Sequence, residues 1–302
     1  MTIVKDEARL NPAPVPPARE SGAGAPPTLR QYVSQLGYAA AGSEAGPQPR
    51  ADRLRPWLVV AGFVVPLALL ALWWFLTEFS IVPAHRMPSP QRVLDAAVAM
   101  TADGVIFGHI AISTQRVVLG FAAGSLLGLA LGAWVGLSKW GSAFLSPTVG
   151  AFRAVPSLAW VPLLVLYLGI SEDSKVTLIA IGALFPVYTT VAGALRHVDP
   201  HLVELGQAFG LARLGLLARV QLPAVVPSIV SGLRLALAQA WLFLVAAELI
   251  ASSVGLGFLL VDSQNNGRVD RLFLTIILLG VLGKTTDALI GLLERWLLKR
   301  WG

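Results

Sequence analysis

Ionisable side chains inside otherwise apolar stretches are the first candidates for chemistry in this sequence. They are Arg116, Arg153, Arg234 and Glu248. A charge in an apolar environment is costly, so such residues usually face a partner or a water-filled cavity. Because a guanidinium binds oxyanions through several hydrogen bonds, Arg153 or Arg234 is expected to line a route for an anion, with Gln239 and Trp241 forming polar and aromatic walls. The alternative is that these arginines cap helix ends or pair with Glu248 or with carbonyl groups.

A second candidate is a short stretch that resembles a phosphate-binding loop, GVLGKTT at Gly280–Thr286. A phosphate loop needs the spacing GxxxxGK[ST] after a strand, so that backbone N–H groups surround the phosphates. Here the first glycine is two residues too close, and the segment continues an apolar helix. Lys284 and Asp287 are therefore interpreted as a helical i, i+3 pair, and nucleotide binding at this stretch is not expected.

A third candidate is a group of potential metal ligands, His197, Asp199, His201 and Glu204. Zinc on a helix needs ligands on one face, but Pro200 interrupts the turn between the two histidines. Asp199 and Pro200 instead indicate the N-cap and first turn of a helix that presents Glu204. No metal site, no cofactor in this chain and no catalytic residue is expected.

Composition places the chain in a membrane. Hydrophobic residues make up 55% of the 302 residues and charged residues only 13%, whereas a soluble domain carries roughly 25% charge. The net charge of +6 is spread singly between apolar stretches, which is typical of cytoplasmic loops of membrane proteins and does not indicate nucleic-acid binding. The absence of cysteine excludes disulfides and thiolate chemistry.

The first 55 residues differ from the rest, because proline, alanine and glycine dominate them. Such a segment buries too little apolar area to offset its ordering entropy, so a mostly disordered cytoplasmic tail is expected. A short amphipathic helix is possible at 28–40. Residues 56–302 form the second expected domain.

Six apolar stretches in this second domain are long enough to cross about 30 Å of hydrocarbon. They cover about 57–76, 106–137, 143–168, 175–195, 224–247 and 272–293. Within the second stretch, glycines recur every four residues from Gly120 to Gly136, which lets another backbone approach closely. Between the first two stretches, an amphipathic helix at 89–102 is expected along the outer membrane surface, with Ser89 as its N-cap and Pro90 in its first turn. Its predicted apolar face comprises Val93, Leu94, Ala97 and Val98.

The distribution of Lys and Arg orients these stretches, because cytoplasmic loops are enriched in both. With both termini in the cytoplasm, ten basic residues are cytoplasmic: Arg50, Arg53, Arg55, Lys139, Arg196, Arg213, Arg219, Arg295, Lys299 and Arg300. Five lie outside: Arg86, Arg92, Lys175, Arg268 and Arg271. This orientation also puts residues 204–223 in the cytosol.

The cytosolic stretch ELGQAFGLARLGLLARVQLP (204–223) resembles the EAA loop of ABC importer permeases. The spacing of that loop is Glu-Ala-Ala, then three residues, Gly, nine residues, an aliphatic residue, one residue and Leu-Pro. This sequence matches it with Glu204, Gly210, Val220 and Leu222-Pro223. Leu205 and Gly206 replace the two alanines. Stretches elsewhere, including FRAVPSLAWVPLLVLYLGI (152–170), AAELI (246–250) and GLG (255–257), are similar to the nitrate/sulfonate/taurine permease family, and most similar to its aliphatic-sulfonate branch.

The resemblance implies an all-α membrane protein with the type I ABC importer permease fold and six transmembrane helices. It implies a homodimer with the pathway at its axis, an external substrate-binding protein, and two cytosolic ATPase subunits that bind ATP and Mg²⁺. It also implies the bacterial inner membrane as location. The helix at about 199–214 would couple the permease to the ATPase. Asp199-Pro200 would start a helix, Gly210 would end it at a positive φ, and Leu222-Pro223 would fix the entry into the fifth apolar stretch. The implied coupling residues are Glu204, Leu205, Gly206, Ala208, Phe209, Gly210, Leu211, Arg213, Leu222 and Pro223.

The substrate stays open at this point, since sulfonate, taurine, nitrate and bicarbonate permeases share the scaffold. A secondary transporter or channel with six spans is the alternative from another class, but it leaves the EAA spacing unexplained. An intramembrane enzyme is disfavoured because no catalytic constellation is present.

Overall fold

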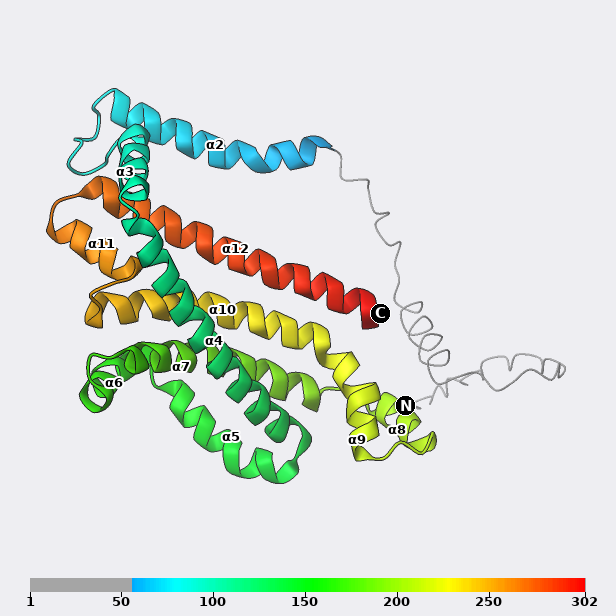
Figure 1. Ribbon diagram of the computed structural model, residues 1–302. Coiled ribbons are helices and arrows are strands. Elements are labelled where there is room, and N and C mark those ends of the chain that lie inside the picture. Colours follow the sequence, from blue (N-terminus) through cyan, green and yellow to red (C-terminus); the bar gives the residue numbers. More distant parts are fainter. Residues whose placement is uncertain (1–55, 302) are drawn as a thin grey trace, which may run out of the picture. The chain divides into compact units, whose positions relative to one another are not determined.

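The computed structural model describes residues 56–301, and within this range the regular elements are all helical (Figure 1). The prediction of an all-α protein is confirmed for these residues. The expected tail at 1–55, with its possible helix at 28–40, lies outside them.

The helices follow one another with short connections. Their bounds are α2 Pro56–Glu78, α3 Pro90–Ala102, α4 Val105–Leu137, α5 Lys139–Ala154, the 3-10 helix η1 Ser157–Trp160, α6 Val161–Leu168, α7 Glu172–Arg196, α8 Pro200–Ala208, α9 Arg213–Leu216, the π-helical turn η2 Leu217–Gln221, α10 Leu222–Ala251, α11 Leu256–Asn265 and α12 Val269–Trp301.

The close pairing of α4 with α7 organises the core. The glycines of α4 face α7 so closely that a Cβ on Gly124 would collide with the Ala180 carbonyl oxygen, and one on Gly132 would lie 2.9 Å from the Val191 Cβ. The predicted role of the glycine stripe in helix packing is therefore confirmed. At its last member, Gly136 lies against Leu195. Since Gly120, near the start of α4, lies against Ile179, near the start of α7, α4 and α7 run parallel.

Helix α10 packs on the same pair and completes the core. Leu244 and Ala240 of α10 are fully buried and share a cluster with Leu178 and Ile179 of α7. Phe243 packs directly on Gly182 of α7, where a Cβ would collide with the ring. These contacts make α4, α7 and α10 a tightly packed unit.

Large apolar side chains remain exposed on the outer faces of several helices. Leu126 of α4 and Leu166 of α6 are 66% and 76% exposed, and similar residues line α2 and α12. Apolar patches of this extent are rare on soluble proteins. The exposed apolar faces agree with a protein that lies in a lipid bilayer.

Four helical stretches are long and apolar enough to cross a membrane. They are Val105–Leu137, Glu172–Arg196, Arg213–Ile250 and Val269–Trp296. The bent pair formed by Lys139–Ala154 and Ser157–Leu168 would be a fifth. In α2, the part from Gly62 to Glu78 is apolar but shorter. The described residues thus contain four or five apolar spans.

The stretch at 143–168 is not the single continuous helix that its length suggested. It breaks after Ala154, and the two halves lie at 86° to each other. Pro156 explains the break, because a proline disfavours the α conformation in the residue before it. Val155 accordingly has an extended ψ of 125°. Pro162 then stands in the first turn of α6, where a missing N–H has no cost.

The predicted N-cap of α3 is confirmed, because the Ser89 side chain accepts a hydrogen bond from the Arg92 N–H and Pro90 stands in the first turn. The predicted apolar face is only partly buried against the rest of the chain. Val93 is buried, together with Ala96 and Met100, whereas Leu94 and Val98 are exposed. The three buried residues are spaced i, i+3 and i+7, so they lie on one side of the helix. This side packs in a core cluster that includes Leu274 of α12.

Candidate functional site

Helix α8 has the boundaries that its sequence predicts. The Asp199 carboxylate accepts a hydrogen bond of 2.9 Å from the His201 N–H, and Pro200 occupies the first turn. Gly210 follows the helix with φ +73°, a conformation that favours glycine. The predicted N-cap and the predicted glycine stop are both confirmed. Glu204 is exposed on this helix, with His201 as its neighbour at 3.8 Å.

The chain turns after Gly210 and starts a new helix at Arg213. The expected coupling helix at about 199–214 is therefore two helices, α8 and α9, joined by this turn. Leu222-Pro223 does not mark the entry into the next span either, because the helical run of that span starts at Arg213. Helix α9, the π-turn η2 and α10 form one continuous helical run. Pro223 explains the π-turn, because proline has no N–H to donate to the carbonyl four residues earlier. Here the Leu222 N–H donates to the Leu217 carbonyl instead.

Gly206 is the contact point between α8 and the following helix. It is buried, and a Cβ there would lie 2.5 Å from Leu216 Cδ1 and 3.2 Å from Val220 Cγ2. Leu216 and Val220 therefore pack directly over the α8 backbone. The glycine at a position where the EAA pattern has alanine thus has a local reason, because the α8 backbone and the side chains of Leu216 and Val220 approach closely at this point.

One face of the α8–α9 segment, defined as residues 199–216, is open and carries both apolar and basic groups. Phe209 is 49% and Leu214 is 82% exposed. Ala208 and Arg213 are also exposed, and Leu205 and Leu211 are half-buried. Phe209 and Leu214 are the large apolar residues that this segment exposes, so the segment is a candidate protein-binding surface.

The buried polar residues gather in one network around Arg116 of α4. Its Nε and Nη2 donate to the Glu172 carboxylate at 2.6 and 2.7 Å. Its Nη1 donates to Glu248 at 2.6 Å and to the Val254 carbonyl at 2.7 Å, with Ser252 at 3.1 Å. Arg116 is 4% exposed and Glu248 is 1% exposed. An ion pair so deeply buried persists only if its hydrogen bonds are satisfied, and here every nitrogen of the guanidinium has a partner.

Glu248 is held from the other side by Ser113 of α4 and by the chain that follows α10. The Ser113 hydroxyl donates to its carboxylate at 2.8 Å, and the Gly257 N–H donates at 2.7 Å. A Cβ on Gly255, which has φ +131°, would collide with the same carboxylate. The two glycines of the GLG stretch therefore leave room for Glu248. Arg116 and Glu248, two of the expected pathway residues, belong to one interhelical ion pair.

Arg234 of α10 has partners on α12. Its guanidinium donates to both oxygens of Asp287 at 2.9 and 3.0 Å and to Glu294 at 3.3 Å. Lys284 lies 3.5 Å from the same Asp287, so the predicted i, i+3 pair is confirmed. Arg234 thus has acidic partners, but they are Asp287 and Glu294 and not the Glu248 or carbonyl groups that the alternative named.

The other expected pathway residues lie apart from these networks. The Trp241 indole is buried and donates to the Thr286 hydroxyl at 2.9 Å. Arg153 is exposed in the last turn of α5, and Gln239 is half-buried in α10. Neither side chain makes a hydrogen bond or ion pair to another described residue. Among the expected pathway residues, Arg153 and Gln239 are therefore the two whose polar groups are available to a ligand.

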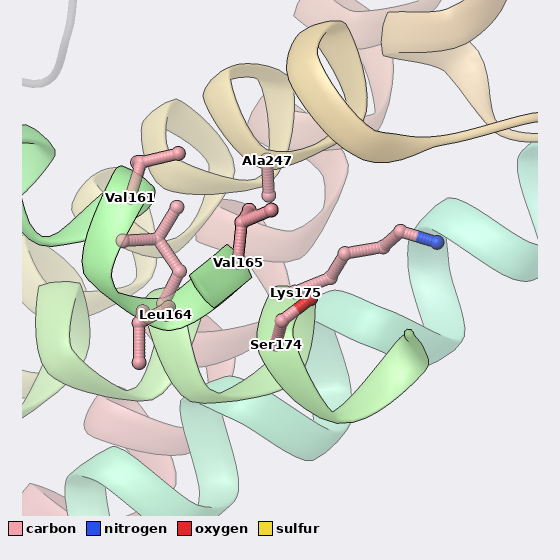
Figure 2. Close-up of a pocket in the computed structure, with 7 residues that line it drawn as sticks. Val161, Leu164, Val165, Ser174, Lys175 and Ala247 are labelled. Atoms are coloured by element: carbon pink, nitrogen blue, oxygen red, sulfur yellow. The ribbon is translucent and has the colours of Figure 1, made fainter. Parts of the chain in front are cut away.

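Two cavities lie near these elements. The smaller, shown in Figure 2, has a volume of about 10 Å³ and is lined by Val161, Leu164, Val165 and Ala247 together with Ser174 and Lys175. In Figure 2 the Lys175 side chain extends away from the valines, and its ammonium group reaches Glu172 at 2.8 Å. This volume suits about one water molecule, so the cavity is a packing defect and holds no substrate.

The larger cavity is an open groove of about 550 Å³ between α3 and the turn from α11 to α12. Charged residues of both signs line it: Arg92, Asp95, Arg268, Asp270 and Arg271. No ion pair joins these five side chains to other described residues. The groove thus offers an array of charges to a partner or ligand.

Residues 120–299 match the family described as binding-protein-dependent transport system inner membrane component. The chain belongs to this family. Members of this family are transport components of the inner membrane. The resemblance to ABC importer permeases is therefore confirmed.

Curated relatives cover most of the permease. The aliphatic sulfonates transport permease protein SsuC of Bacillus subtilis is 38% identical, over 86% of this chain and 96% of its own. The taurine transport permease TauC of Escherichia coli is 31% identical, over 75% and 84%. The nitrate import permease NrtB of Leptolyngbya laminosa is 34% identical, over 74% and 82%. The permease is therefore similar to sulfonate, taurine and nitrate permeases along most of its length.

Several residues of the permease networks were missed at the sequence level. Glu172 and Asp287 neutralise the two paired arginines, and Ser113 and Thr286 complete the hydrogen bonds. Glu172 follows Ser171, the N-cap of α7, and an acidic residue there is explained by the helix dipole alone. The sequence carries no signal that would link it to Arg116, 56 residues away.

Proposed function

We propose that this permease imports aliphatic sulfonates. The supporting observation is the 38% identity to SsuC over nearly the full length of that relative, compared with 31% to TauC and 34% to NrtB. A sulfonate is a tetrahedral oxyanion that arginine side chains bind well. Taurine, nitrate and bicarbonate are the alternative substrates.

The substrate is tested by uptake. Proteoliposomes that contain the permease with its ATPase subunits, supplied with its binding protein, are given labelled ethanesulfonate, taurine, nitrate or bicarbonate. ATP-dependent accumulation of ethanesulfonate above the other three supports the proposal, whereas preferential accumulation of another anion contradicts it. Transport that persists without ATP and without the ATPase subunits would instead indicate a secondary transporter or channel.

The α8–α9 segment is proposed to be the ATPase-coupling element. Its exposed residues Glu204, Phe209 and Arg213 would contact a groove of the ATPase, with Glu204 pairing with a basic residue there. Gly206 and Gly210 would set the shape of the segment, because one permits close packing on Leu216 and the other permits the turn.

The remaining residues of the predicted coupling set would support this contact from within the segment. Ala208 precedes Phe209 and Leu205 precedes Gly206 in the sequence, and Leu211 Cδ1 lies 3.6 Å from the Cβ position of Gly206. Leu222 and Pro223 stand at the end of the π-turn that connects the segment to α10. A short rigid segment fixed to a long helix can transmit rigid-body motion between domains.

Replacement of Gly210 by valine tests the coupling role. A β-branched side chain is strained at φ +73°, so Gly210→Val should abolish transport and transport-coupled ATP hydrolysis while the permease remains in the membrane. Gly193→Val is the matched control, since Gly193 has ordinary helical geometry and open space around its Cβ position. Normal transport by Gly210→Val would contradict the assignment.

The assembly is proposed to follow from the family. Two permease copies would form the pathway at their shared axis, two ATPase subunits would bind ATP and Mg²⁺ in the cytosol, and a binding protein would dock outside. Each copy would have six spans with both termini in the cytoplasm of a bacterial inner membrane. The mixed charges of the groove at α3 suit contact with the binding protein.

The route for the anion is proposed to use Arg153 and Gln239. Both carry polar groups without a partner in the described part of the chain, whereas Arg116, Arg234 and Glu248 are engaged in ion pairs. Uptake by an Arg153→Gln variant should fall, and unchanged uptake would remove Arg153 from the route.

A further inference from the structure

The α8–α9 segment lies between two long helices that both return to the Arg116 network. Helix α7 ends just before α8, and α10 begins just after η2. The distant end of α7 carries Glu172, its first residue. The distant end of α10 carries Glu248, three residues before that helix ends at Ala251. Both acidic residues are bound to Arg116.

Arg116 therefore connects α7 and α10 at the ends that lie far from the α8–α9 segment. The guanidinium uses two nitrogens for Glu172 and the third for Glu248, and it adds the Val254 carbonyl in the turn before α11. Arg116 itself is anchored on α4, the helix whose glycines pack along α7. At their other ends, α7 and α10 are joined covalently through the α8–α9 segment and η2.

We infer that Arg116 is a positioning residue for transport, because it clamps the distant ends of α7 and α10 together. With both ends joined, a displacement of the α8–α9 segment moves the two helices as one body and reaches the turn at α11. Without the clamp, the two helices can separate at their distant ends. A displacement of the α8–α9 segment then bends α7 and α10 and does not reach the turn at α11. The inference rests on the proposed coupling role of the α8–α9 segment.

Glu172 is the member of the clamp best suited to a test. Its side chain is 61% exposed, whereas those of Arg116 and Glu248 are 5% and 0% exposed. Neutralising Glu172 cuts the link to α7 but leaves the buried pair of Arg116 with Glu248 intact. Asp173 is the matched control, because it is an exposed acid in the same helical turn and makes no ion pair with another described residue.

The first measurement is the separation of the two helix ends. The sequence contains no cysteine, so spin labels can be placed on Ile170→Cys and Ile250→Cys, at positions 72% and 60% exposed. Labelled permease is diluted with unlabelled copies, so that only distances within one chain are measured. The parent and Asp173→Asn should show one narrow distance, and Glu172→Gln should show a broad or second distance.

The second measurement is the number of ATP molecules hydrolysed per substrate imported by the reconstituted transporter. For Glu172→Gln this ratio should rise by about fivefold or more, the lower end of typical coupling effects, while Asp173→Asn keeps the parental ratio. A narrow distance in Glu172→Gln, or a broad distance with the parental ratio, would overturn the inference.

Two further observations keep the test decisive. If Glu172→Gln does not accumulate in the membrane, Glu172→Asp replaces it, since this variant keeps the charge but shortens its reach, and the same two outcomes apply. If the coupling role of the α8–α9 segment is wrong, Gly210→Val leaves ATP hydrolysis unchanged, whereas the distance measurement still reports on the clamp. Failure of the clamp and failure of the proposed function are thus distinguishable.

Discussion

The guanidinium of Arg116 lies 2.6 Å from the carboxylate of Glu248, although 132 residues separate them in the sequence. Both side chains are almost completely buried. The pair joins α4 to the end of α10, and the serine and glycine contacts around Glu248 extend it to α11. Opposite charges placed in this way allow two costly intramembrane residues to neutralise each other.

Removal of one partner of this pair should destabilise the permease strongly. Arg116→Met leaves Glu248 buried and uncompensated, which typically costs about 3–5 kcal/mol. The expected result is a large fall in membrane accumulation and in the unfolding temperature in detergent. Arg153→Met is the control, because this exposed arginine pairs with no other described residue, and its stability should match the parent. Equal stability of both variants would contradict the description of the pair.

The contact between Gly124 and Ala180 predicts a sharp positional dependence along α4. A Cβ on Gly124 would collide with backbone atoms of α7, which cannot move aside as a flexible side chain can. Gly124→Ala should therefore cost about 1–3 kcal/mol, the usual range for overpacking. Gly108→Ala on the same helix has no atom within 4 Å of its Cβ position and should be neutral or slightly stabilising. Thermal unfolding of the two variants in detergent separates these outcomes, and an equal shift would be inconsistent with close packing at Gly124.

The ion pair between Arg234 and Asp287 predicts rescue by a second substitution. Arg234→Gln leaves Asp287 with only Lys284 as a basic partner, and Asp287→Asn leaves Arg234 with only the longer contact to Glu294. Each single variant should lower the amount of permease in the membrane, and the double variant should recover most of it. Immunoblots of membrane fractions measure the amounts. Additive losses in the double variant would show that the two residues act independently.

Local signals made the α8–α9 segment largely predictable from the sequence. Asp199 and Pro200 specify a helix start, and Gly210 specifies a stop, through interactions within a few residues. The glycine repeat of α4 was equally informative, because its four-residue spacing maps to one helix face. In both cases the residues that form the sequence pattern also form the structural feature, within one short stretch of chain.

Features that depend on distant contacts were not predictable in the same way. The partner of Arg116 at Glu172, and that of Arg234 at Asp287, follow from how α4, α7, α10 and α12 pack. The bend after Ala154 was signalled by Pro156, but proline also occurs inside continuous helices of this chain, such as Pro186 in α7. Hydropathy alone therefore could not separate a bent pair from a straight span.

The central claim is that the α8–α9 segment contacts an ATPase subunit, and site-specific cross-linking tests it most directly. Because the chain has no cysteine, a thiol-reactive benzophenone can be attached at Phe209→Cys and, as a control at a more exposed site, at Leu94→Cys on α3. Illumination of the assembled transporter should give a permease–ATPase adduct from position 209 and none from position 94. An adduct from position 94, or none from position 209, would contradict the account.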